Sequence, residues 1–241
     1  MKPSRCVLRG VMVCALALTA MGGLSACSNP LKNSAPRSEY FVLRDLAPVP
    51  ATTAAPANPM GGVSENPAVA AGSPRVLMIA AGPTPTLFDS ERMVFSPDGV
   101  SRAYYHFANW SERPARSLVQ LAEARLAQDP AWKSVVSTVA GARGDLLLTL
   151  KVDDLTHDDS RQPGTVRVAV TAELLDWRQR RLLQRRPFER SVSVETRNAA
   201  GAAGAANRAV TLLLDDLSTW AREAAAGVRN ESRQIQSSSG M

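Results

Sequence analysis

Cysteine and histidine are scarce in this chain of 241 residues, which has three cysteines and two histidines. The cysteines are Cys6, Cys14 and Cys27, and none follows Cys27. The rest of the chain can therefore form neither an internal disulfide nor a cysteine-based metal site. The histidines, His106 and His157, stand in no motif typical of a catalytic site. We therefore predict that the protein is not an enzyme.

The chain also lacks the glycine-rich motifs that bind nucleotides and the G-x-S-x-G turn of serine hydrolases. After Cys27 it has no apolar run of the roughly 20 residues that a transmembrane helix needs. The formal charge is +6, but three of the 28 basic residues lie before Cys27, which leaves 25 against 22 acidic ones. Nucleic-acid binding usually needs a focused basic face, so no nucleic-acid partner is predicted. Because the nucleotide-binding motifs are missing, no cofactor is predicted either.

The first 26 residues have the parts of a secretory signal peptide. Three basic residues lie at the start, and an apolar run from Val11 to Met21 has the length of a signal core. Leu24-Ser25-Ala26-Cys27 resembles the lipobox of bacterial lipoproteins, in which the cysteine thiol receives a diacylglycerol before cleavage. We therefore predict that residues 1–26 are removed and that Cys27 is lipidated. An uncleaved membrane anchor is the alternative.

Acyl chains on Cys27 would hold the protein on a membrane without a transmembrane helix, because each buried CH₂ contributes about 0.8 kcal/mol. The next residue is Ser28. In enteric-type bacteria an aspartate at that position signals retention at the inner membrane. By analogy we expect the outer membrane, with a tether at residues 27–39 and a domain that faces the periplasm.

Residues 40–226 form the predicted domain. Tyr40-Phe41-Val42-Leu43 is its expected first strand. Residues 45–74 are rich in alanine and proline and lack the bulky apolar side chains that a core needs, so we predict a disordered insert there. The polar segment 227–241 is expected to be a flexible tail.

Hydrophobic periodicity predicts the other elements of the domain. Further strands are expected at 75–81, 92–95, 103–107, 132–139, 146–152, 165–174 and 182–194. One helix is expected from Pro114, with Ser111 as a cap, and a second carries an apolar stripe from Val210 to Ala224. This order predicts a single α+β domain with a mixed or mostly antiparallel sheet and two helices packed on it.

Four acids and a histidine lie within Asp153–Asp159, a composition that could suit a metal ion. The spacing matches no known loop or helix motif for a metal. The segment falls where one strand must turn into the next, and aspartates are common in turns because they bond to the backbone. We therefore expect a solvated hairpin tip and no metal.

Two groups of residues are candidate contacts for a partner or a lipid. The first group is aromatic, like many interface hot spots, and consists of Tyr104, Tyr105 and Trp110. Core packing is the alternative for these side chains. The second group is basic and consists of Arg178, Arg180 and Arg181, which begin a run that continues to Arg185 and Arg186. It could meet phospholipid head groups or an acidic protein surface, and an ordinary solvated hairpin is the alternative.

At four places the chain is similar to the ABC-type transport auxiliary lipoproteins. The first is Tyr40-Phe41-Val42-Leu43 after the anchor, and the second is Arg92-Met93-Val94-Phe95 with the aromatic strand and Asn109-Trp110. The third is the helix from Pro114, with Leu118 and Leu126. The fourth is Leu148 to Leu155, then Leu182-Leu183 and Arg186-Pro187-Phe188, and a helix with Leu217 and Trp220. The likeness covers roughly Tyr40 to Ala226.

The resemblance implies a role in an MCE-type system, in which an ABC transporter and an MCE-domain protein move lipids between two membranes. The lipoprotein would be the outer-membrane component and would act by docking or lipid handover, without bond-making chemistry. It also implies self-association, because some relatives form rings. Two alternatives remain: a binding lipoprotein of another envelope assembly machine, and a periplasmic hydrolase, because catalytic triads occur in several sequence orders.

Overall fold

The computed structural model describes residues 37–48, 75–138, 141 and 143–238. The described residues from Ser38 onward belong to one compact unit. The predicted signal peptide, Cys27, and most of the tether and of the insert lie outside these ranges. The elements are β1 (Glu39–Phe41), β2 (Arg75–Ala81), β3 (Arg92–Ser96), β4 (Ala103–Trp110), α2 (Pro114–Leu126), β5 (Trp132–Ser137), β6 (Leu146–Asp158), β7 (Thr165–Asp176), β8 (Arg181–Ser193) and α3 (Ala199–Ser238).

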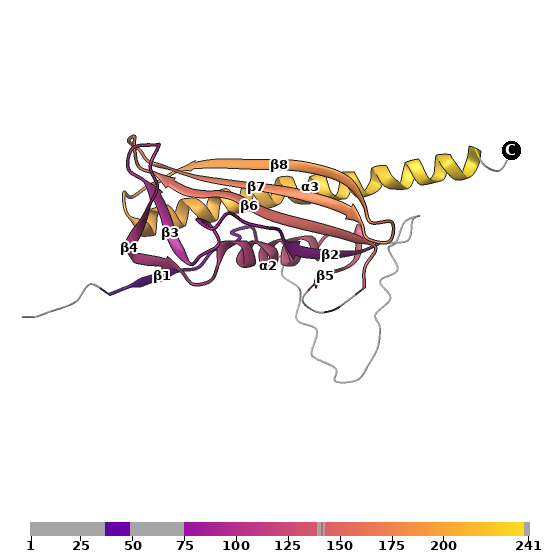
Figure 1. Cartoon of the computed structure of the whole chain (residues 1–241), viewed down its shortest axis with the longest axis horizontal. Coiled ribbons are helices and arrows are strands. Elements are labelled where there is room, and N and C mark those ends of the chain that lie inside the picture. The colour runs from indigo at the N-terminus through magenta and orange to yellow at the C-terminus, as the bar shows by residue number, and fades with distance from the viewer. Residues whose placement is uncertain (1–36, 49–74, 139–140, 142, 239–241) are drawn as a thin grey trace, which may run out of the picture. The chain divides into compact units, whose positions relative to one another are not determined.

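Strand β6 is the centre of a mixed, curled sheet of eight strands (Figure 1). On one side, β6, β7 and β8 form the antiparallel meander that the sequence predicts. The other side of β6 is shared by two branches. Strand β2 runs parallel to Leu146–Leu150 and pairs with β5, whereas β3 runs parallel to Thr156–Asp158 and leads through β4 to β1. The sheet therefore forks along β6.

The strict alternation along β7 decides which face of the sheet is buried. Its even-numbered residues from Val166 to Leu174 are all buried, and the odd-numbered ones are not. Helix α3 packs along β7 and β8 on the buried face (Figure 1). The opposite face carries polar pairs such as Arg167 with Glu189, at 2.8 Å. The sheet therefore has one apolar and one polar face.

Helix α2 packs on β2, β5 and β6 and contacts α3. Proline opens it as expected, but the predicted cap is wrong: the residue at the N-cap position is Arg113, and no side chain caps the helix. Ser111 instead donates its backbone N–H to the carbonyl of Phe41. The hydroxyl of Ser111 therefore contributes no cap to α2.

Helix α3 is longer than expected at both ends. It begins at Ala199, within the Gly/Ala-rich stretch. Four alanines of this stretch are at most 2% exposed, because their small side chains lie directly against the core: Ala202, Ala205, Ala206 and Ala209. The helix also continues past Gly227 to Ser238. The fold class is confirmed: one α+β domain with two helices on a mixed sheet.

The start of the predicted insert is tied to both helices. Arg125 of α2 donates to the two carboxylate oxygens of Asp45, at 2.8 and 2.6 Å, and also pairs with Asp215 of α3. The backbone N–H of Leu46 donates to the hydroxyl of Thr211, at 2.8 Å. Residues 45–48 are thus part of the domain, whereas residues 49–74 lie outside the described part of the chain.

Candidate partner-binding surface

The turn between β7 and β8 displays apolar and basic side chains together. Trp177 and Leu182 are each 50% exposed, and the side chain of Arg178 is 78% exposed. The backbone holds the turn in place, because the N–H of Trp177 donates to the carbonyl of Asp145, at 3.0 Å. Arg180 adopts a φ of 52°, a left-handed conformation that is uncommon for a residue with a side chain.

The arginines of this region differ in their partners. Arg178 pairs with Asp145 at 2.6 Å, and Arg185 pairs with Glu173 at 3.3 Å. Arg181 also has a partner. Arg186 is exposed, and its guanidinium lies 5.2 Å from the centre of the Phe188 ring. Among the described residues, no carboxylate within 4 Å pairs with Arg186.

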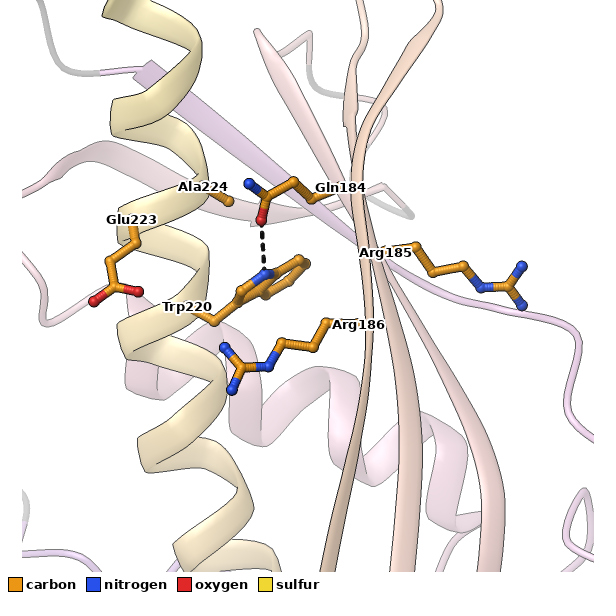
Figure 2. Close-up of a pocket in the computed structure, with 6 residues that line it drawn as sticks. All are labelled: Gln184, Arg185, Arg186, Trp220, Glu223 and Ala224. Atoms are coloured by element: carbon orange, nitrogen blue, oxygen red, sulfur yellow. Dashed lines mark hydrogen bonds between the residues drawn. The ribbon is translucent and has the colours of Figure 1, made fainter.

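A shallow groove of about 390 Å³ lies between β8 and α3 (Figure 2). Its lining residues are Gln184, Arg185, Arg186, Trp220, Glu223 and Ala224. The indole N–H of Trp220 donates to the side-chain oxygen of Gln184, at 2.9 Å. The Trp220 ring also meets Phe188 edge to face, with 5.6 Å between the ring centres. The floor of the groove is therefore a buried aromatic contact.

The charged side chains at the groove point in different directions. Figure 2 shows Arg186 beside Trp220 on the face of β8 that α3 covers, and Arg185 on the opposite face. Glu223 also lines the groove but points away from Arg186, on the other side of α3. The groove can thus offer the guanidinium of Arg186 to a ligand, above a floor in which Trp220 is buried and bonded to Gln184.

The structure does not bring the aromatic candidates to this surface. The guanidinium of Arg92 lies over Tyr104, 3.7 Å from the centre of the tyrosine ring. Tyr105 bonds to His157, near the far end of β6. Trp110 is only 4% exposed, so it is a core residue and offers no surface to a partner. The two candidate groups therefore lie toward opposite ends of β6.

The predicted hairpin tip at Asp153–Asp159 is wrong. Strand β6 continues to Asp158, and His157 within it is only 3% exposed. Sequence periodicity missed this extension, because it depends on pairing with a distant strand: Phe95 of β3 lies beside His157. The turn itself begins after Asp158. No group of three or more metal-ligating side chains assembles in the part of the chain that the structure describes.

The surroundings of His157 form a closed polar centre. A hydrogen bond of 2.6 Å joins its Nδ1 and the hydroxyl of Tyr105, whose ring packs 4.9 Å from Phe95. Its Nε2 is buried without a hydrogen-bond partner. Burial lowers the pKa of His157 from 6.5, against the opposing effect of Asp159. Burial also raises the pKa of Tyr105 to about 12. These shifts favour the neutral forms of both side chains.

A larger hollow of about 860 Å³ lies where α2 meets the ends of β2 and β5. Small residues such as Ala80, Ala81 and Ala115 contribute to its lining. Its charged residues have partners: Arg113 lies 3.8 Å from Asp89, and a carboxylate oxygen of Glu123 accepts from the N–H of Ser137. Sequence reasoning found neither this hollow nor the roles of Gln184 and Trp220, because no local pattern predicts which strand a helix will cover.

The fold and surface are those of an α+β domain with two grooves and an arginine-rich turn on its surface. The chain belongs to the ABC-type transport auxiliary lipoprotein component family, whose model matches residues 61–218. This confirms the resemblance in the sequence. Among the described residues, no helix has the length and apolar character needed to span a membrane.

One solved structure supports the fold, and others are more distantly similar. A protein from Xanthomonas campestris matches with a TM-score of 0.60 and 19% identity, over 68% of this chain and 93% of that one. A protein from Caulobacter crescentus has a TM-score of 0.36 and 16% identity, over 58% and 93% of the two chains. PelC from Paraburkholderia phytofirmans, solved as a dodecamer, has a TM-score of 0.32 and 14% identity, over 58% and 87%. Scores below 0.5 do not establish a shared fold. No curated protein matches the chain.

Proposed function

We propose that this protein is a lipid-anchored accessory component of an MCE/ABC-type lipid transport system. It acts by docking or lipid handover at the outer membrane, with its domain in the periplasm, and it carries out no bond-making chemistry. The single observation that supports this proposal is membership of the transport auxiliary lipoprotein family. Its partners are then an MCE-domain protein and the ABC transporter.

Crosslinking in cells, followed by purification of the full-length protein, tests the proposed partners. An MCE-domain protein, a permease and an ATPase should be recovered together with it. Recovery of a different envelope complex would support the alternative, a binding lipoprotein of another assembly machine. Recovery without any transporter component would contradict the proposal.

The anchor is tested separately with Cys27→Ser. This change removes the thiol that would receive the lipid, so the precursor should stay uncleaved and leave the membrane fraction that holds the wild-type protein. Cys14→Ser is the matched control, because it changes a cysteine within the predicted signal peptide and should leave processing intact. Mass spectrometry of the amino terminus reads the result. A mature chain without acyl groups at Cys27 would contradict the proposed anchor.

A further inference from the structure

Strand β8 has an open edge. Within the described ranges, this strand of thirteen residues pairs only with β7. Most of its residues are exposed. An open strand edge presents unpaired N–H and C=O groups, to which another extended segment can bind as an added strand. The edge of β8 is therefore a candidate binding site of the main-chain type.

Pro187 divides this edge. Proline has no N–H, so it is tolerated where the backbone nitrogen points away from the neighbouring strand. Pro187 lies opposite Thr171 of β7, and its nitrogen then points to the open side. An added strand cannot accept a hydrogen bond from it. The part of the edge next to the arginine-rich turn is Arg181–Arg186, which contains an irregularity at Leu183, because Gln184 lies opposite Leu174 and Leu182 lies opposite Leu175.

This same half of β8 forms one wall of the groove in Figure 2. Helix α3 forms the other wall, through Trp220 and Ala224. A segment added to Arg181–Arg186 would lie against the groove, where every second side chain could reach in toward Trp220. The groove and the open edge are thus parts of a single binding surface.

The positive charge of Arg186, which has no acid partner among the described residues, indicates what kind of segment this surface binds. Along the face of β8 that α3 covers, Arg190 pairs with Asp216 of α3. One turn later α3 presents Trp220 in place of an acid, and Glu223, which also lines the groove, points away from Arg186. The segments of this chain outside the described residues cannot supply a carboxylate readily, because residues 1–36 contain no acid and residues 49–74 contain only Glu65.

We propose that Arg181–Arg186 and the adjoining groove bind an extended acidic segment of a partner protein. The segment pairs with β8 as an added strand and places a carboxylate against Arg186. This inference rests on the proposed function, for which it names the docking surface and the chemistry of the partner.

Site-specific photocrosslinking in cells tests the proposal with the full-length protein. A photoreactive phenylalanine analogue replaces Leu182, which is 50% exposed within the Arg181–Arg186 segment, or Val100, which is 87% exposed at the other end of the sheet. The Leu182 position should yield an adduct whose mapped peptide contains acidic residues in an extended run. The Val100 position should not yield it.

Two matched pairs of variants separate charge from main-chain pairing. Arg186→Glu should lower the adduct yield about tenfold or more, since it replaces a charge-assisted bond by repulsion, whereas Arg161→Glu at the exposed β6–β7 turn should not. Arg185→Pro should abolish the adduct by removing an outward N–H, whereas Arg185→Ala should retain most of it. Circular dichroism checks that each variant is folded. If Arg185→Pro is not folded, the adduct yield of Arg186→Glu alone tests the proposal.

Several outcomes overturn the proposal. These are an adduct with a lipid, an adduct with a second copy of this chain, a mapped peptide without acids, or a Leu182 yield no higher than that of Val100. If transporter components are still recovered by general crosslinking in that case, the proposed function stands and only this docking surface is wrong.

Discussion

The two ends of β6 are built in opposite ways. At the end near Asp158, strands on both sides enclose His157, and its polar contact with Tyr105 is internal. At the end near Leu146, the adjoining β7–β8 turn exposes Trp177 and Leu182. The end near Asp158 thus encloses a polar contact, although Val100 is exposed there, whereas the end near Leu146 exposes apolar side chains beside arginines.

This difference indicates which end is structural and which is available for binding. A buried polar group that loses its partner costs stability, because nothing replaces the lost bond. An exposed arginine or tryptophan contributes little to folding, but such residues dominate interface hot spots. Substitutions at the closed end should therefore act on folding, and exposed substitutions at the open end should act on binding. Trp220 is the exception, because it belongs to the core beneath the groove.

The largest expected effect comes from Trp220→Ala. Its side chain is 4% exposed and joins β8 to α3 through Phe188 and Gln184. Removing a buried tryptophan ring leaves a cavity, so the free energy of unfolding should fall by about 3–5 kcal/mol. Urea unfolding followed by circular dichroism measures it. Leu212→Ala on α3, 47% exposed, is the control. Equal losses in the two variants would mean that the groove floor is not a packed core.

Tyr105→Phe should have an intermediate effect at the closed end. It removes the hydroxyl that bonds Nδ1 of His157, whose Nε2 already lacks a partner. Leaving a buried ring nitrogen unpaired should lower the free energy of unfolding by about 1–3 kcal/mol. The neighbouring Tyr104→Phe is the control and should change it by less than about 0.5 kcal/mol. A Tyr105→Phe variant as stable as the wild type would show that this bond contributes nothing.

Mild acid should also weaken the closed end. Burial holds the pKa of folded His157 below 6.5, so the unfolded chain takes up a proton first as the pH falls. The stabilisation is complete above 6.5 and is lost as the pH falls below it. Urea unfolding at pH 7.5 and 5.5 should show lower stability at pH 5.5, and His157→Gln should reduce the difference. The exposed His106→Gln is the control. An unchanged difference in His157→Gln would assign the effect to another group.

Local pattern was enough to predict most of the fold. The alternation from Val166 to Leu174 correctly predicts β7 and its buried face, and Pro114 correctly marks the start of α2. The true end of β6 was missed, because aspartates favour turns locally and the pairing of His157 with Phe95 joins distant parts of the chain. Non-local pairing outweighed local preference there.

The candidate surface was predicted only in part. The basic run from Arg178 to Arg186 was visible in the sequence, but its arginines look no different there from Arg190, which lies outside the run. Only the packing of α3 separates Arg190, which has an acid partner, from Arg186, which faces a groove. Trp110 shows the same limit in reverse, because its aromatic character fits both a core and an interface, and burial decides for the core.

The smallest expected effect on stability belongs to Arg178→Ala at the open end. Its ion pair with Asp145 measures 2.6 Å, but the arginine side chain is 78% exposed. Water screens such pairs, so the free energy of unfolding should change by less than about 1 kcal/mol in the urea experiment. Trp177→Ser at the same turn should be similarly mild. A loss of several kcal/mol in Arg178→Ala would mean that the turn is structural. The contrast between the two ends of β6 would then no longer separate folding from binding.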